Sequence, residues 1–285
     1  MIEGITLEDG KYGKRAVATS VWSGEITDFL VDRGIKELEL NDGKGWRGSD
    51  LSFLAKLPNL HALTIIDLKI PSVEPVHLLP ELRALEIITY CKTEIRFEVF
   101  SHLEECALEW RPRAVSLFDR TTLKRLFINR YDGKAVDRFA NLVGLESLAI
   151  LNAQVDNVRA LGALTNLRSL RLANLKRLTS LEGIEHLVNL EELEIHTCRA
   201  IGSIEQLSAL SRLRRLNLNN DGNIKTLRPL EGLTSLESVI FYESTNVVDG
   251  DLTPLLRGKH LSRVSFQDRR HYSHRRGDFG VAYTR

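Results

Sequence analysis

The chain has 285 residues, 43% of them hydrophobic and 27% charged, a composition typical of a soluble globular protein. Its 39 Lys and Arg residues nearly balance its 38 Asp and Glu residues, so the net charge of +1 provides no long-range attraction to nucleic acid or to an anionic membrane. The 47 leucines greatly outnumber the 10 phenylalanines, 6 tyrosines and single methionine, and this bias indicates a repeat architecture.

The first 34 residues predict a cap for such an architecture. No apolar stretch near the start has the length of a secretory signal, and nowhere do 18 uncharged apolar residues run together, so we expect a cytoplasmic protein that does not insert into a membrane. A strand is predicted from Arg15 to Trp22, followed by a helix that begins after a Ser23 cap and ends at Gly34. The apolar face of this helix is Ile26, Phe29 and Leu30.

A single motif, L-x-x-L-x-L with close variants, recurs along most of the remaining chain. From Leu60 onward, successive copies start 20 to 25 residues apart. The last two apolar residues of each motif alternate with polar ones, so each copy predicts one short parallel strand with a buried face. Apolar residues at intervals of three, as in Ile201, Ile204 and Leu207, then suit a tight 3-10 return. The eleven copies start at Ile35, Leu60, Leu82, Leu103, Leu123, Leu145, Leu167, Leu190, Leu213, Leu236 and Leu261.

These units resemble the leucine-rich-repeat family, in its short-repeat bacterial and phosphatase-regulator-like branch, over roughly residues 35–268. The clearest matches are LRSLRLANLKRLTSLEGIEHLVN from Leu167, LEELEIHTCRAIGSIEQLSALSR from Leu190 and LRRLNLNNDGNIKTLRPLEGLTS from Leu213. The resemblance implies an α/β solenoid, a horseshoe with a parallel concave β-sheet and short helical or 3-10 convex segments. Residues 1–34 are then an N-terminal cap and residues 269–285 a C-terminal cap or tail. The family's ladder of Asn or Cys after each strand is kept only at Cys198.

Charged residues at the second position of the motif support this register, because their sign alternates from one copy to the next. Equivalent residues of neighbouring parallel strands lie about 4.8 Å apart, where opposite charges attract and like charges repel. We interpret these residues as a self-neutralising ladder, and a binding patch is the alternative. They are Arg83, Glu104, Lys124, Glu146, Arg168, Glu191, Arg214 and Glu237, and the third position repeats the alternation at Glu105, Arg125, Glu192 and Arg215.

No motif of an enzyme is present in the sequence. There is no G-x-S-x-G, no P-loop, no H-E-x-x-H and no dinucleotide-binding glycine pattern. The three cysteines have unrelated spacings without a C-x-x-C pair, which disfavours a disulfide framework and a zinc site. We expect Cys106 and Cys198 to be structural and Cys91 to be the exposed thiol. The sequence therefore predicts no enzyme, no metal and no cofactor.

The predicted concave face is the candidate binding surface, because solenoid proteins bind along such faces and because Trp, Tyr and Arg are frequent binding hot spots. For Trp110, a position turned inward is the alternative, since its repeat contains Pro112. The irregular loops between Leu60 and Leu145, and the arginine-rich tail, are alternative binding sites, with loop drift and a solvated tail as their structural interpretations. The candidate residues are Glu86, Glu109, Trp110, Phe127, Arg130, Arg171, Glu194, His196, Tyr242 and Glu243.

Mixed charges and a few aromatic residues on this face favour a specific protein partner over a nucleic acid or a membrane. We expect a monomeric scaffold that binds and does not catalyse. The family resemblance suggests an immunity-type role, in which the protein blocks a toxin domain inside the cell that makes it. A regulatory subunit of an endogenous enzyme such as a phosphatase, and a host-directed bacterial effector, are the alternatives.

Overall fold

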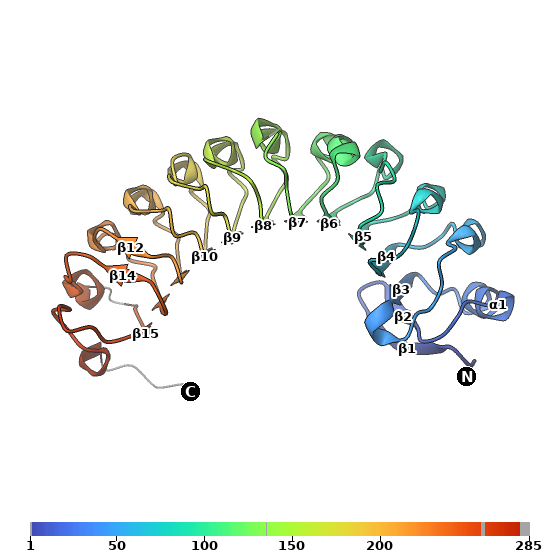
Figure 1. Ribbon diagram of the computed structural model, residues 1–285, viewed down its shortest axis with the longest axis horizontal. Coiled ribbons are helices and arrows are strands. Elements are labelled where there is room, and N and C mark those ends of the chain that lie inside the picture. The colour runs from blue at the N-terminus through green and yellow to red at the C-terminus, as the bar shows by residue number, and fades with distance from the viewer. Residues whose placement is uncertain (1, 135, 258–259, 280–285) are drawn as a thin grey trace. The chain divides into compact units, whose positions relative to one another are not determined.

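The computed structural model describes residues 2–134, 136–257 and 260–279, and the chain divides into unit 1, up to Ile128, and unit 2, from Asn129 onward. Each unit is a run of repeats, with strands along one side and short helical turns along the other (Figure 1). Helix α1 (Gly24–Asp32) is the one α-helix among the described residues, and the other helical segments, η1 to η12, are 3-10 turns. No helix in these ranges is long and apolar enough to cross a membrane.

Unit 1 contains a sheet whose strands follow chain order from β1 to β7. The neighbouring strands from β2 to β6 are parallel, as predicted, because each repeat returns the chain to the same side before the next strand. The strands are β1 (Ile5–Gly10), β2 (Gly13–Ala18), β3 (Glu37–Asn41), β4 (Ala62–Ile66), β5 (Ala84–Ile88), β6 (Glu105–Glu109) and β7 (Arg125–Asn129). The turns are η1 (Asp42–Lys44), η2 (Ser52–Lys56), η3 (Glu74–Leu78), η4 (Phe97–Val99) and η5 (Pro112–Asp119).

The start of unit 1 differs from the predicted strand over Arg15 to Trp22. Strand β2 ends at Ala18, and β1, which was not predicted from the sequence, pairs with it in an antiparallel hairpin. The chain leaves the sheet before Trp22, and the Trp22 indole stacks on Phe53 of η2 with ring centroids 3.7 Å apart. The residues assigned to the end of the strand therefore connect the sheet to α1.

Helix α1 forms where the sequence predicted it. The Ser23 hydroxyl caps its first turn by accepting a hydrogen bond from the Ile26 backbone nitrogen at 3.4 Å. Ile26 and Leu30 are buried, whereas Phe29 is only half-buried. Gly34 has a φ of 60°, a left-handed conformation that glycine adopts without a steric penalty, and it ends the helical segment.

Unit 2 continues the same pattern in its own sheet strands, which are ordered β8-β9-β10-β11-β13-β15 and parallel. Two short strands, β12 and β14, pair in a second small parallel sheet. The strands are β8 (Ser147–Leu151), β9 (Ser169–Ala173), β10 (Glu192–His196), β11 (Arg215–Asn219), β12 (Asn223–Ile224), β13 (Ser238–Phe241), β14 (Asn246–Val247) and β15 (Arg263–Phe266). The turns are η6 (Val136–Asn141), η7 (Arg159–Ala163), η8 (Ile184–His186), η9 (Glu205–Ala209), η10 (Arg228–Leu230), η11 (Thr253–Arg257) and η12 (Arg276–Phe279).

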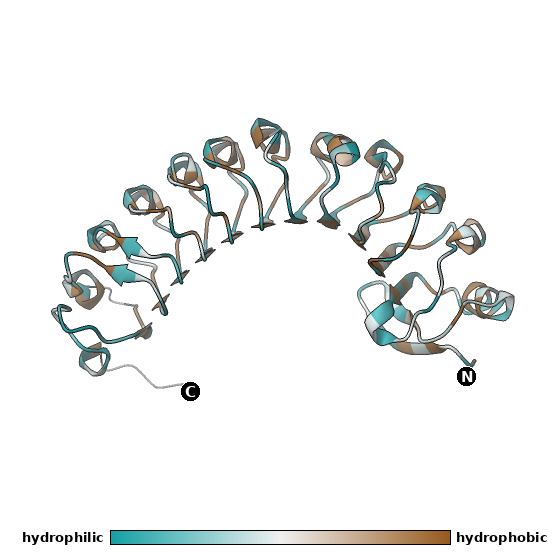
Figure 2. Ribbon diagram, viewed as in Figure 1, coloured by the Kyte–Doolittle hydropathy of each residue, from teal (hydrophilic) through white to brown (hydrophobic). Residues whose placement is uncertain are grey.

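The core of each unit lies between its strands and its 3-10 turns. Along the strands, buried apolar residues alternate with residues that face solvent, as the motif predicts. The predicted interval of three is confirmed at Ile201, Ile204 and Leu207, each at most 1% exposed. Figure 2 shows hydrophobic and hydrophilic residues alternating around the turns of both units. The predicted tail extends beyond Phe279 into residues 280–285, which lie outside the described part of the chain.

Candidate binding surface on the sheet

The strand side chains that do not enter the core form the solvent side of the sheet in each unit, which we call the sheet face. It corresponds to the predicted concave surface. In unit 2 the register aligns Ala149, Arg171, Glu194, Asn217 and Ile240 in one row across five strands. A partner that lies on this face therefore meets these side chains in succession.

Three predicted site residues of unit 2 come together at the middle of this face. The Arg171 Nε atom lies 3.4 Å from Glu194 Oε2, and the same oxygen lies 3.6 Å from His196 Nε2. The side chains are between 27% and 50% exposed, so a partner can reach part of each, although the His196 Nε2 atom is enclosed. The cluster offers a guanidinium, a carboxylate and an imidazole within one surface area, a combination suited to polar recognition.

Tyr242, another predicted site residue, is half-buried and already engaged within unit 2. Its hydroxyl shares a hydrogen bond with Ser265 Oγ at 2.7 Å and accepts one from Arg276 Nη1 at 3.2 Å. The hydrogen bond to Ser265 lowers the pKa of Tyr242, burial opposes this, and the Arg276 guanidinium lowers the pKa further. Tyr242 therefore connects β15 to the tail segment at Arg276.

The predicted residues Arg130 and Glu243 occupy a recurring backbone position in unit 2. Six residues just after strands have a positive φ between 53° and 60°, although none is glycine. Each of the first five donates its backbone N–H to a carbonyl in the following repeat, as from Asn152 to Ala173 at 2.9 Å and from Asn174 to His196 at 2.8 Å. The six residues are Arg130, Asn152, Asn174, Thr197, Asn220 and Glu243.

Asparagine side chains connect these positions into a second ladder at the edge of the sheet face. Asn152 Nδ2 donates to Asn129 Oδ1 at 2.7 Å, and Asn174 donates in turn to Asn152. Farther along, Asn220 Nδ2 donates to Thr197 Oγ1 at 3.2 Å. Asn tolerates the left-handed conformation better than most residues, which explains its recurrence here. The ladder was not predicted from the sequence, although the motif placed several of these asparagines on the outward side.

In unit 1 the predicted site residues Glu86 and Phe127 are half-buried on the sheet face. Glu109 differs from the expectation, because its side chain is buried with a residue exposure of 5%. Arg111, two residues later, is 4% exposed and donates from Nη2 to the Thr89 carbonyl at 3.2 Å. Glu109 therefore does not present a carboxylate to a partner as predicted.

The side chain of Trp110 is turned partly inward, which is the alternative that the sequence left open. Its indole is half-buried and packs against Phe118 of η5, with ring centroids 5.6 Å apart and an angle of 47° between the rings. The residue follows β6 directly, where the chain turns into the segment containing Pro112. Part of its surface therefore contributes to packing within unit 1, and its role as a partner-binding residue stays a prediction.

The alternating charges form ion pairs at several steps of the predicted ladder, but Glu146 makes none among the described residues. At the second position of the motif, nitrogen and oxygen atoms of neighbouring repeats approach to between 2.6 and 3.7 Å. These pairs are Arg83–Glu104 (3.7 Å), Lys124–Glu104 (3.5 Å), Arg168–Glu191 (2.6 Å) and Arg214–Glu237 (2.7 Å), and the third position adds Arg125–Glu105 and Arg215–Glu192. Because the paired charges neutralise one another, they contribute more to the register of the strands than to a binding site.

Comparison with solved structures gives similar folds at low identity. An internalin, inlF, from Listeria monocytogenes is 20% identical with a TM-score of 0.63, over 78% of this chain and 67% of that chain. Internalin C2 from the same organism is 21% identical with a TM-score of 0.50, over 74% of this chain and 83% of that chain. Internalins are leucine-rich-repeat proteins. The chain has the leucine-rich-repeat fold. No family model and no curated protein matches the sequence.

One residue of the leucine-rich-repeat ladder was not predicted from the sequence. Asp221 lies 23 residues after Cys198, in the slot where the family carries Asn or Cys. It is fully buried, and its Oδ1 accepts a hydrogen bond from the Cys198 backbone nitrogen at 2.8 Å. Its Oδ2 atom has no hydrogen-bond partner among the described residues, and burial raises the pKa of Asp221 to about 7. The equal spacing from Cys198 was the signal that could have identified it.

Cys106 and Cys198 are buried in the leucine-rich-repeat core as predicted, whereas Cys91, which was predicted to be exposed, is half-buried. Burial raises the pKa of both core thiols, that of Cys198 to about 12. Burial also acts on Cys91, but the Arg111 guanidinium, 3.1 Å from Sγ, and hydrogen bonds from Thr93 outweigh it, so its pKa is below the usual value. The described residues contain no group of three His, Cys, Asp or Glu side chains that could hold a metal ion.

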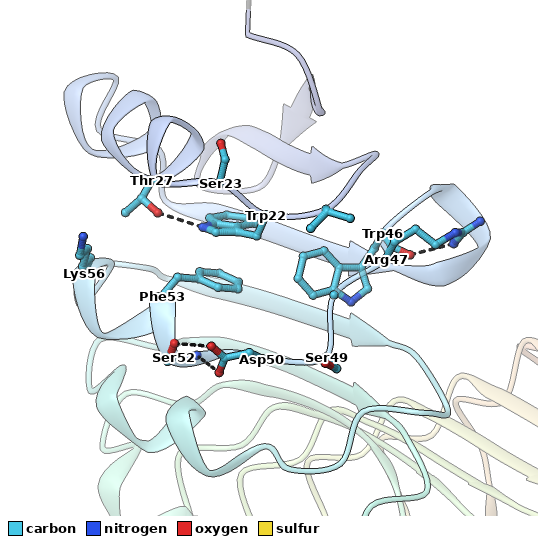
Figure 3. Close-up of a pocket in the computed structure, with 13 residues that line it drawn as sticks. Trp22, Ser23, Thr27, Trp46, Arg47, Ser49, Asp50, Ser52, Phe53 and Lys56 are labelled. Atoms are coloured by element: carbon cyan, nitrogen blue, oxygen red, sulfur yellow. Dashed lines mark hydrogen bonds between the residues drawn. The ribbon is translucent and has the colours of Figure 1, made fainter.

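A pocket of about 520 Å³ opens beside the start of the leucine-rich repeats in unit 1, between α1 and η2. Figure 3 shows Trp22, Phe53 and Trp46 around it. The Trp22 and Phe53 rings stack on each other, and Trp22 Nε1 donates to Thr27 Oγ1 at 2.9 Å. The ring faces that Trp22 and Phe53 turn toward each other are occupied by this stacking contact. The aromatic group therefore joins α1 to the first repeat more than it offers a binding surface.

Proposed function

We propose that this protein is a non-enzymatic scaffold that binds a protein partner through its sheet face. The observation that carries the proposal is the cluster of Arg171, Glu194 and His196, which is polar, partly exposed and held on adjacent strands. Binding sites on rigid elements lose little conformational entropy when a partner docks. Solenoid repeat proteins in general use extended faces of this kind for binding.

The specific role we propose is that of an immunity-type inhibitor, which binds a toxin domain inside the cell that makes both proteins. Support comes from the mixture of charges on the sheet face, which suits a protein surface, and from the neutralised ladder, which leaves no strong attraction to nucleic acid. Regulation of an endogenous enzyme such as a phosphatase, or action as a bacterial effector on a host, would use the same surface. The identity of the captured partner distinguishes these roles.

The test is a pull-down from lysate of the source organism with the tagged full chain, followed by identification of the bound protein. The variant Arg171→Ala removes one member of the central cluster without touching the core. We expect it to lose at least about tenfold in affinity, the loss typical of a hot-spot arginine. Trp110 and Tyr242 are unsuitable for this purpose, because both also pack within their units.

The matched control is Arg177→Ala. Arg177 is also exposed and also paired, with its Nε 2.7 Å from Asp156 Oδ1, but it lies in the return after β9 and outside the sheet strands. Retention of the partner by Arg177→Ala and its loss by Arg171→Ala would support the proposal. Equal capture by both variants would exclude the central cluster as the binding surface. If this chain itself converted a substrate of the purified partner, the non-enzymatic scaffold role would be excluded.

A further inference from the structure

One carboxylate on the sheet face of unit 1 has surroundings unlike those of the others. The strand register places Glu86 between Thr64 of β4 and Ala107 of β6, with Ala84 and Ile88 on the same face of its own strand. We call these five residues the Glu86 patch. Because three of the five side chains are apolar and two are only methyl groups, the carboxylate stands among small apolar neighbours.

The neighbouring carboxylates on this face already have cationic partners. Glu39 is paired with Lys44 at 3.0 Å and with Arg15 at 3.4 Å. Glu105 is paired with Lys11 and with Arg125. Their negative charges are therefore balanced inside unit 1 and are not available to attract a partner strongly.

Glu86 has no such balance. No Lys, Arg or His nitrogen forms an ion pair with it among the residues that the structure describes, and its hydrogen-bond partner is the Thr64 hydroxyl at 3.4 Å. Burial raises the pKa of Glu86 and the nearby charge of Glu39 adds to the increase, whereas the Thr64 hydrogen bond and the more distant Arg15 charge oppose it without cancelling it. A partly desolvated carboxylate without a paired counter-charge is an unfavourable arrangement that an incoming cation relieves.

We propose that the Glu86 patch receives a lysine or arginine side chain of the protein partner, a proposal that rests on the function given above. The cationic group pairs with the Glu86 carboxylate, and the aliphatic stem lies across the methyl groups of Ala84 and Ala107. Neighbouring strands are about 4.8 Å apart, so a stem of three or four methylene groups spans both. An apolar or acidic side chain at this point would bury Glu86 without a counter-charge, so the patch selects a basic residue.

The experiment uses the full chain and an array of immobilised peptides GSLXLSG, in which X is lysine, arginine, norleucine or glutamate. We expect the chain to retain the lysine and arginine peptides at least about tenfold better than the norleucine peptide. The preference should decline between about 0.05 and 0.5 M salt, as expected for an ion pair at a partly exposed site. The variant Glu86→Gln should lose the preference, because it keeps the shape of the side chain and removes its charge.

The matched control is Glu98→Gln, which removes one charge from an exposed residue of η4 in the same unit. If Glu98→Gln keeps the preference and Glu86→Gln loses it, the patch recognises a basic side chain. If the wild-type chain retains lysine and norleucine peptides equally, or if both variants behave like wild type, the proposal is overturned. Failure of this proposal leaves the proposed scaffold function intact. The pull-down with Arg171→Ala tests that function separately, in unit 2 and with the natural partner.

Discussion

At the scale of single residues, the buried carboxylate of Asp221 makes stability dependent on pH. Its pKa is raised from 3.8 to about 7, chiefly by burial, while the hydrogen bond from Cys198 lowers it and only partly compensates. At pH values between these two pKa values, the Asp221 carboxyl therefore keeps its proton in the folded chain but has lost it in the unfolded chain. The contribution of Asp221 to stability is therefore greatest below about pH 4, declines between about pH 4 and pH 7, and stays at its low value above pH 7.

Replacing Asp221 with Asn should stabilise the protein at high pH. The amide keeps an oxygen for the Cys198 N–H but carries no charge, so the penalty for a buried anion disappears. We expect a gain of up to roughly 4 kcal/mol at pH 8 and little change at pH 4, measured by urea unfolding at both values. The exposed Asp137→Asn should show no such dependence, and an equal gain at both pH values would contradict the explanation.

The three thiols should differ strongly in reactivity. Cys91 combines partial exposure with the electrostatic influence of Arg111, whereas Cys106 and Cys198 are buried and have raised pKa values. Brief treatment of the native protein with iodoacetamide, followed by peptide mass spectrometry, should label Cys91 first. The variant Arg111→Gln should slow that reaction, and labelling of Cys198 at the same rate as Cys91 would show that the burial argument fails.

At the scale of elements, the strands and the regular 3-10 returns were predictable, and the irregular returns of unit 1 were not. The alternation of leucines predicted the strands, and the alternating charges predicted the register that Arg168–Glu191 and Arg214–Glu237 confirm. Periodicity says which way a strand residue points, but not how the chain leaves the strand. Glu109 is an example, because the motif placed it on the outward side and the structure buries it.

The turn after β10 contains a local conflict between sequence and backbone. Thr197 has a φ of 58°, and a β-branched residue is strained in this left-handed conformation. Equivalent positions in other repeats of unit 2 hold Asn152, Asn174 and Asn220, which adopt it more readily. The Thr197 hydroxyl does accept a hydrogen bond from Asn220, so its polar contact is retained at a cost in backbone strain.

The variant Thr197→Asn should therefore increase the free energy of unfolding by about 1 kcal/mol, because it relieves the strain and keeps an oxygen for Asn220. The measurement is the midpoint of thermal or urea unfolding. Thr197→Val retains the branched shape without the hydroxyl and should be less stable than wild type. If Thr197→Asn were neutral or destabilising, backbone strain would not limit the stability of this turn.

At the scale of the whole molecule, stability comes from stacking, because no single repeat buries its leucines alone. The last described strands of unit 2 depend on an aromatic group for this purpose. Phe241 and Phe266 are parallel with centroids 4.9 Å apart, and Tyr272 packs edge-on against both. The Tyr272 hydroxyl also accepts a hydrogen bond from the Val247 backbone nitrogen at 3.1 Å, which joins the following segment to β14.

Removing this ring should destabilise nearby repeats and leave distant ones in the same unit unchanged. We expect Tyr272→Ala to cost about 3–5 kcal/mol and Tyr272→Phe, which loses only the hydrogen bond to Val247, about 1–3 kcal/mol. Hydrogen exchange should accelerate in β13 and β15, because they lie next to the ring, while β9 keeps its protection. Equal acceleration in β9 and β15 would mean that unit 2 unfolds as one cooperative body, contrary to the nearest-neighbour behaviour that a stacked array implies.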